Sequence, residues 1–103
     1  MTTDTPNKRI NILGTYYEVK TVKSSEIDNH AGLCEFYDKR ISISTDQDFS
    51  CIEDKQRAFR HEIIHAFFHE SGLLSFADDE ILCDFLASQF PKLNRLFTDL
   101  GIL

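Results

Sequence analysis

The first half of the chain alternates hydrophobic and polar residues in the period of β-strands. Over residues 9–22, β-branched and aromatic side chains surround Gly14-Thr15, a pattern that predicts a β-hairpin with a two-residue turn. The sequence therefore begins with a pair of antiparallel strands.

A second hairpin is predicted from residues 33–37 and 40–44, which flank a turn at Asp38-Lys39. Isoleucine alternates with serine along 40–44, as in a strand with one buried face. The polar stretch 24–32 between the two hairpins is expected to form a loop.

Helical patterns replace strand patterns after Asp46. The tetrapeptide Ser50-Cys51-Ile52-Glu53 has the S-x-x-E form of a capping box, and about twenty residues without Gly or Pro follow it. Gly72 is expected to end this long helix.

Two shorter helices are predicted after Gly72. One covers residues 78–90 and is ended or kinked by Pro91, and the last extends from about 92 to 100 and closes at Gly101. Strands followed by helices predict an α+β fold: a small antiparallel sheet of two hairpins packed on a long helix and two further helices.

Composition fits one small domain that comprises residues 1–103. A chain of 103 residues with 42% hydrophobic content has room for a single core, near the size at which a bound metal adds useful stability. Residues 1–8 are mostly polar and are expected to be disordered or extended. Three cysteines, an odd number at wide spacing, predict reduced thiols in the core (Cys34, Cys51 and Cys83).

Charge and hydropathy exclude several classes of partner. The net charge of −6 comes from 11 Lys and Arg against 17 Asp and Glu, without a basic cluster, so we expect no nucleic-acid partner. No apolar run has the length of a signal sequence or a membrane span, so we expect a cytoplasmic protein without a membrane partner.

The segment His61-Glu62-Ile63-Ile64-His65 carries the chemistry that the sequence predicts most directly. Two histidines four positions apart lie on one face of a helix and can bind a single Zn²⁺, while Glu62 points to the side and can act as general base on a water. The alternative is a helix with two ordinary surface histidines. The surrounding residues are apolar around most of the helix, so the polar groups there need partners, and we favour the metal.

A catalytic zinc has three protein ligands, so the histidine pair needs one more. We predict Glu80 as the third ligand, with Asp79 or Cys83 as alternatives, and Asp84 one turn after Glu80 as an acceptor for a ligand imidazole N–H. A third histidine of the metzincin kind is excluded, because Phe68 and Ser71 hold the positions of its glycine and histidine.

Other polar residues are expected to lie outside the set of ligands. His69 lies about 12 Å along the helix from His61, too far to share an ion, and is expected to be solvated or hydrogen-bonded. Several side chains compete, unranked, to stabilise an oxyanion (His30, Tyr16, Tyr17, Tyr37 and Arg60).

The His61 motif followed by Glu80-Ile81-Leu82-Cys83-Asp84 resembles the HExxH plus ExxxD pattern of gluzincins. The compact form is similar to small metallopeptidases of phages and mobile elements, related to the ImmA/IrrE group and the minigluzincins. The resemblance covers residues 12–103, is strongest over 60–92, and includes residues 65–73 and 89–92. It implies a zincin-like domain with His61, His65 and Glu80 as ligands, Glu62 as base and Asp84 as orienting residue. It also implies an exposed sheet edge that receives an extended peptide.

Three functions follow as hypotheses. The first is a zinc-dependent endopeptidase that hydrolyses peptide or protein substrates. The second is a zinc-stabilised, non-catalytic protein-binding module of phage or mobile-element origin. The third is a metal-free module with vestigial histidines.

Overall fold

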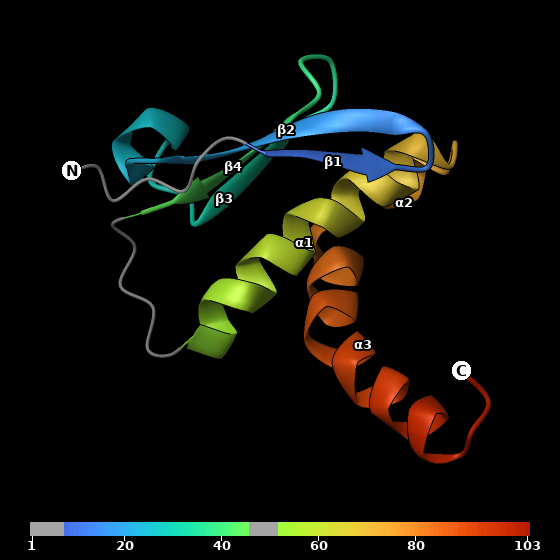
Figure 1. Ribbon diagram of the computed structural model, residues 1–103. Coiled ribbons are helices and arrows are strands. Elements are labelled where there is room, and N and C mark those ends of the chain that lie inside the picture. Colours follow the sequence, from blue (N-terminus) through green and yellow to red (C-terminus); the bar gives the residue numbers. More distant parts are fainter. Residues whose placement is uncertain (1–7, 46–51) are drawn as a thin grey trace.

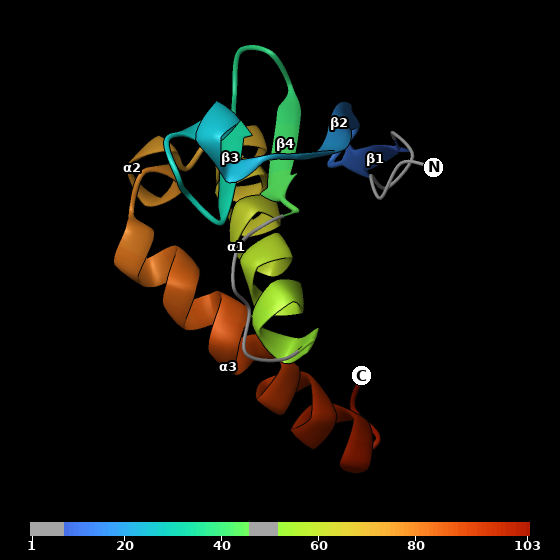
Figure 2. The same ribbon diagram turned by 90° about the vertical axis from the view of Figure 1, so that its left-hand side faces the viewer.

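The computed structural model describes residues 8–45 and 52–103 and has the α+β architecture that the sequence predicts. A four-stranded sheet lies over the long helix α1, and α3 packs against α1 and extends beyond it (Figures 1 and 2). The elements in chain order are β1 (Lys8–Ile12), β2 (Thr15–Val22), the 3-10 helix η1 (Ser24–Ile27), β3 (Gly32–Glu35), β4 (Arg40–Ser44), α1 (Ile52–Glu70), α2 (Leu74–Ala77) and α3 (Glu80–Asp99).

The sheet is mixed, with strand order β1-β2-β4-β3. Each predicted hairpin is antiparallel, but the hairpins join through parallel pairing of β2 with β4, so the prediction of an antiparallel sheet is wrong at this junction. The physical reason is burial. Ile41 and Ile43 face the core, Ser42 and Ser44 are buried as well, and β4 contacts η1, so this strand occupies the interior of the sheet. β3 is left at the edge.

Both hairpin turns differ in detail from the prediction. The first turn is Leu13-Gly14 rather than Gly14-Thr15, because these two residues adopt positive φ angles of 53° and 94° and Ile12 pairs with Thr15. The Asn11 side chain accepts a hydrogen bond from the Gly14 N–H at 2.7 Å. The second hairpin has a four-residue loop at 36–39, so β3 ends two residues earlier than predicted.

The long helix α1 ends at Gly72, as predicted. At Gly72, with φ of 83°, the chain leaves α1, and the N–H groups of Gly72 and Leu73 donate to the carbonyls of His69 and Phe68. The predicted loop at 24–32 contains η1, and α2 lies in the connection to α3.

Helix α3 continues through Pro91, so the prediction of two separate helices, one over 78–90 and another over about 92–100, is wrong. A proline has no N–H to donate to the carbonyl four residues earlier, here that of Ala87. The Arg60 Nε on α1 donates to this carbonyl at 2.8 Å and replaces the missing bond.

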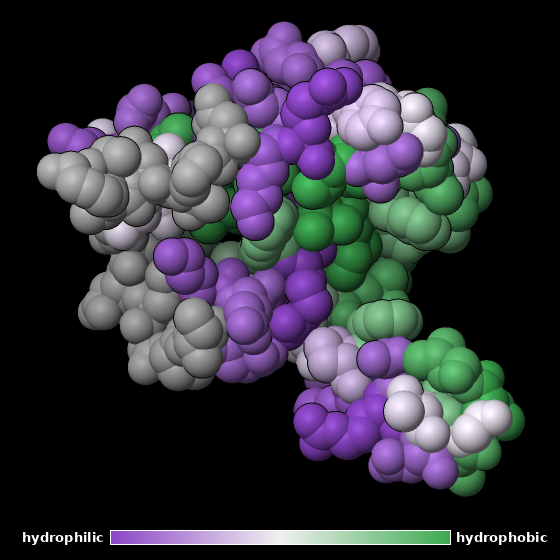
Figure 3. All heavy atoms as spheres, viewed as in Figure 1, coloured by the Kyte–Doolittle hydropathy of each residue, from purple (hydrophilic) through white to green (hydrophobic). Residues whose placement is uncertain are grey.

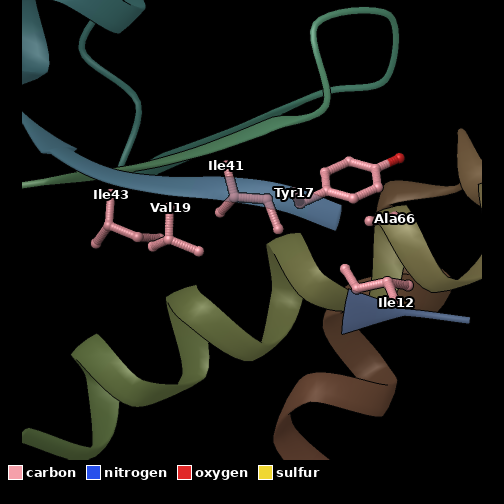
Figure 4. Packing of buried hydrophobic residues seen from close by; sticks show 6 residues of the cluster. All are labelled: Ile12, Tyr17, Val19, Ile41, Ile43 and Ala66. Carbon is pink, nitrogen blue, oxygen red and sulfur yellow. The ribbon is translucent and has the colours of Figure 1, made fainter. Parts of the chain in front are cut away.

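The core lies between the sheet and α1. Alternate residues of β2 and β4 and the last residue of β1 lie between the sheet and α1, and Figure 4 shows Tyr17 and Ile12 beside Ala66 of α1. The buried cluster consists of Ile12, Tyr17, Val19, Ile41, Ile43 and Ala66.

The last residue of α1 is tied to the sheet by a polar cluster. The Glu70 carboxylate accepts hydrogen bonds from Thr15 Oγ1 at 3.0 Å and from Tyr17 OH at 2.7 Å. Lys39 Nζ donates to the same carboxylate at 2.8 Å. These contacts fix the angle at which α1 passes under the sheet.

Some predictions fall on residues outside the described ranges. Ser50 and Cys51 of the expected capping box are among them, as are residues 1–7 of the polar amino-terminal segment; Lys8 already belongs to β1. Within 8–45 and 52–103, none of the helices combines the length and apolarity that a membrane crossing requires.

Candidate metal centre

His61 and His65 of α1 lie on one face of the helix and meet Glu80 from the first turn of α3. Their Nε2 atoms are 3.0 Å apart, and the Glu80 carboxylate lies 2.7 Å from Nε2 of His61 and 3.2 Å from Nε2 of His65. The predicted third ligand is thus at the histidine pair. Its side chain is 74% exposed, so the group forms the open rim of a site rather than a closed cage.

The partner of Nδ1 in each imidazole indicates whether the proton is on Nδ1 or on Nε2. Nδ1 of His65 lies 2.6 Å from the backbone carbonyl of Ala77, which can only accept, so Nδ1 carries the proton. Nδ1 of His61 lies 3.4 Å from the Asp84 carboxylate, as predicted for an orienting residue. In a neutral His65, Nε2 is therefore the unprotonated acceptor. His61 offers the lone pair of its Nε2 when its proton is on Nδ1 and is donated to Asp84.

Three acceptor atoms thus converge on one point from His61, His65 and Glu80, and they lie within 4.8 Å of one another. Such close approach requires a positive centre between the atoms, either a proton that Nε2 of His61 donates to the Glu80 carboxylate or a metal ion bound by all three. A tetrahedral zinc ion with bonds of about 2.0–2.1 Å holds its ligand atoms about 3.3 Å apart. The three side chains are of the types that bind divalent metals. Their ligand atoms are slightly closer together than around a zinc ion, so the imidazole rings and the carboxylate would move apart by a small amount to bind one.

The two alternative ligands have other positions. Asp79 caps α3 and accepts the Leu82 N–H at 2.9 Å. The Cys83 sulfur lies 3.5 Å from Nδ1 of His65, on the side of the ring away from the converging Nε2 atoms. Neither belongs to the group that can hold the ion.

Glu62 is buried beside the two histidines, with 8% of its surface exposed. Burial raises the pKa of its carboxyl, and the imidazoles of His61 and His65 oppose this shift without cancelling it. A carboxylate with a raised pKa accepts a proton more readily than an ordinary glutamate does, which suits a general base.

The backbone of β3 presses directly on this glutamate. A Cβ atom at Gly32 would lie 2.9 Å from Cγ of Glu62 and 3.2 Å from the Ser42 carbonyl. Only glycine allows this approach, so Gly32 fixes the distance between the edge strand and the general-base candidate. The sequence contains no pattern that would reveal this role.

A cleft of about 780 Å³ opens at the site. One wall is β3 with the residues before it, and the other is formed by α1 and the start of α3. Its lining includes the three candidate ligands and Glu62 and Asp84, together with Arg57, which the sequence analysis did not single out.

Among the five candidates for oxyanion stabilisation, His30 lines the cleft, immediately before β3. The others are engaged elsewhere. The Tyr17 hydroxyl binds Glu70, Arg60 binds the Ala87 carbonyl and Glu53, Tyr16 lies under the Arg9 guanidinium, and Tyr37 is 98% exposed.

The remaining predicted residues are not among the three candidate ligands. His69 stacks on the Phe36 ring at 4.2 Å between centroids, instead of facing the ion position. Cys34 and Cys83 are free thiols, and burial raises the pKa of Cys34 to about 12 and that of Cys83 to about 11. Cys51 lies outside the described residues.

Comparisons with protein-family models, with curated proteins and with solved structures find no match for this chain. The resemblance to gluzincins therefore remains a prediction from the motifs.

Proposed function

We propose that this chain is a zinc-dependent endopeptidase. The observation that carries the proposal is the convergence of three acceptor atoms from His61, His65 and Glu80, with the buried carboxyl of Glu62 beside them. Three protein ligands at an open rim leave a coordination position free for water or substrate, as hydrolytic zinc sites require.

Zinc held by these residues would polarise both a water molecule and the carbonyl of the scissile bond. Glu62 accepts the proton of that water and passes it to the nitrogen of the leaving amine. Asp84 and the Ala77 carbonyl keep the imidazoles oriented by accepting their Nδ1 protons. His30 lines the opposite wall of the cleft and would donate a hydrogen bond to the oxygen on which negative charge develops.

The substrate of this proposed enzyme is an extended peptide. Strand β3 is the edge of the sheet and also a wall of the cleft, so a peptide strand that pairs with its outer edge passes over Glu62 and the ligands. Backbone hydrogen bonds would supply affinity, and the side chains in the cleft would supply selectivity.

Glu62→Gln tests this proposal. The variant should bind as much zinc as the wild type and lose peptide hydrolysis, whereas His61→Ala should lose both zinc and hydrolysis. Glu53→Gln makes the same chemical change at a side chain on α1 that is 58% exposed, and it should leave both properties unchanged. Cleavage of a mixed peptide library by Glu62→Gln at the wild-type rate would refute the mechanism.

The alternative is a zinc-stabilised module that binds a protein without cutting it. One observation favours it: the site gathers α1, the Ala77 carbonyl at the end of α2 and Glu80 at the start of α3, so an ion there would fasten three elements. In this case chelation should lower the melting temperature sharply, and no peptide should be cleaved by the zinc-loaded wild type.

A further inference from the structure

Helix α3 carries one apolar pattern over two halves that have different surroundings. In the first half, Cys83 and Ala87 are fully buried. In the second half, Phe90, Leu93 and Leu100 are 52%, 46% and 63% exposed. Figures 1 and 2 show this half extending beyond α1 and the sheet. In Figure 3, hydrophobic atoms line one side of the projecting part and hydrophilic atoms the other.

The apolar residues follow a heptad repeat. Spacings of three and four alternate along α3, which gives one row of apolar side chains: Cys83, Leu86, Phe90, Leu93, Phe97 and Leu100. This is the pattern of a helix that packs against another helix along its length. The first half of the row has such a neighbour in α1, whereas in the second half Phe90, Leu93 and Leu100 are exposed and Phe97 is half-buried.

The flanks of the exposed row are uncharged. Gln89 and Leu96 lie on one side of it, and Asn94 and Gly101 lie on the other. The charged residues of this half, Lys92, Arg95 and Asp99, all lie on other faces of the helix. A second helix with the same sequence can therefore approach without like charges meeting.

We propose that the second half of α3 pairs with the same segment of a second copy of this chain, antiparallel and related by a two-fold axis near residue 95. The row is self-complementary in this arrangement, since Phe90 faces Leu100 of the other copy and Leu93 faces its Phe97. Each of the four layers then combines one phenylalanine with one leucine.

The exposed apolar surface is large enough for this contact. Besides the row, Leu96, Ile102 and Leu103 are 52%, 67% and 75% exposed. Six exposed side chains at roughly 50–100 Å² each give about 300–600 Å² per copy, the range of weak, transient interfaces. A dissociation constant on the order of micromolar is expected.

A lipid surface is a less suitable occupant. Helices that lie on membranes carry several Lys or Arg along the polar face, and the charge of −6 repels anionic headgroups. The projecting half of α3 has only Lys92 and Arg95 as cations.

Sedimentation equilibrium of the full chain, at concentrations from about 1 to 500 µM, tests the proposal. The wild type should form a dimer, and Leu93→Glu should weaken it at least about tenfold. Leu100→Glu is a second variant at the other end of the row. Thr98→Glu adds the same charge outside the apolar row and should dimerise as the wild type does. Circular dichroism melting checks that each variant is folded.

A wild type that stays monomeric over this range would overturn the proposal. Equal dimerisation of Leu93→Glu and Thr98→Glu would also overturn it, because the contact would then use another surface. Binding to vesicles of phosphatidylcholine and phosphatidylglycerol without dimerisation would assign the apolar row to lipid instead.

Discussion

Glu70 offers the clearest test of how α1 is fastened to the sheet. Its carboxylate is 12% exposed and accepts hydrogen bonds from Thr15, Tyr17 and Lys39, which come from β2 and the β3–β4 loop. Glu70→Gln keeps the size of the side chain and removes its charge, so the Lys39 ammonium loses its partner and the Tyr17 hydroxyl loses a charged acceptor.

The magnitude follows from the pKa of the carboxyl. Hydrogen bonds from Lys39 and Tyr17 lower the pKa of Glu70 from 4.5 to about 2, which corresponds to about 3.4 kcal/mol at roughly 1.36 kcal/mol per pKa unit. The Lys39 side chain is 37% exposed, so solvent screens part of this interaction. We therefore expect Glu70→Gln to lower the free energy of unfolding by about 2 kcal/mol at pH 7.

The pH dependence has a definite sign. The folded-state pKa lies below the unfolded one, so the stabilisation is complete above about pH 4.5 and is lost as the pH falls toward 2. The difference between wild type and Glu70→Gln should shrink correspondingly over this window.

Urea denaturation at several pH values, in the presence of a chelator, measures this difference. The chain has no Trp, so circular dichroism is the suitable signal. Glu18→Gln is the control, because the Glu18 side chain is 45% exposed and its ion pair with Lys20 is long, at 3.8 Å. It should change stability by less than about 0.5 kcal/mol. A Glu70→Gln variant as stable as the wild type at pH 7, or a difference that does not shrink in acid, would refute this reasoning.

Two further predictions concern the metal centre. Gly32→Ala places a Cβ 2.9 Å from Cγ of Glu62 and should lower the free energy of unfolding by about 1–3 kcal/mol in urea denaturation. An unchanged denaturation midpoint would show that β3 can move away from α1 without loss of stability. Asp84→Asn should weaken zinc binding about tenfold in a competition titration, because the carboxylate that orients His61 becomes neutral. Asp78→Asn removes a charge from the same cleft and should have a smaller effect, so equal losses would refute an orienting role.

Local chemistry could be predicted from the sequence because it depends on spacing along one helix. Two histidines four residues apart share a face of any α-helix, and an acidic residue at the start of the next helix can fold back beside them. For this reason His61, His65 and Glu80 meet where they were expected.

Contacts that depend on the backbone could not be predicted in this way. The carbonyl of Ala77 has no distinctive side chain, and the role of Gly32 depends on how close β3 comes to α1. Pro91 was expected to end a helix because its missing N–H leaves the Ala87 carbonyl unpaired, and the donor that replaces it, Arg60, is distant in sequence. The parallel pairing of β2 with β4 likewise depends on which strand is buried most deeply.

Metal analysis of the purified wild type beside Glu80→Ala tests the central claim most directly. If three acceptor atoms converge to hold a divalent ion, the wild type should bind one equivalent of zinc and Glu80→Ala should lose most of it, while Asp78→Ala, which removes a different carboxylate of the cleft, should retain it. Equal zinc in the wild type and Glu80→Ala, or none in the wild type, would contradict the account.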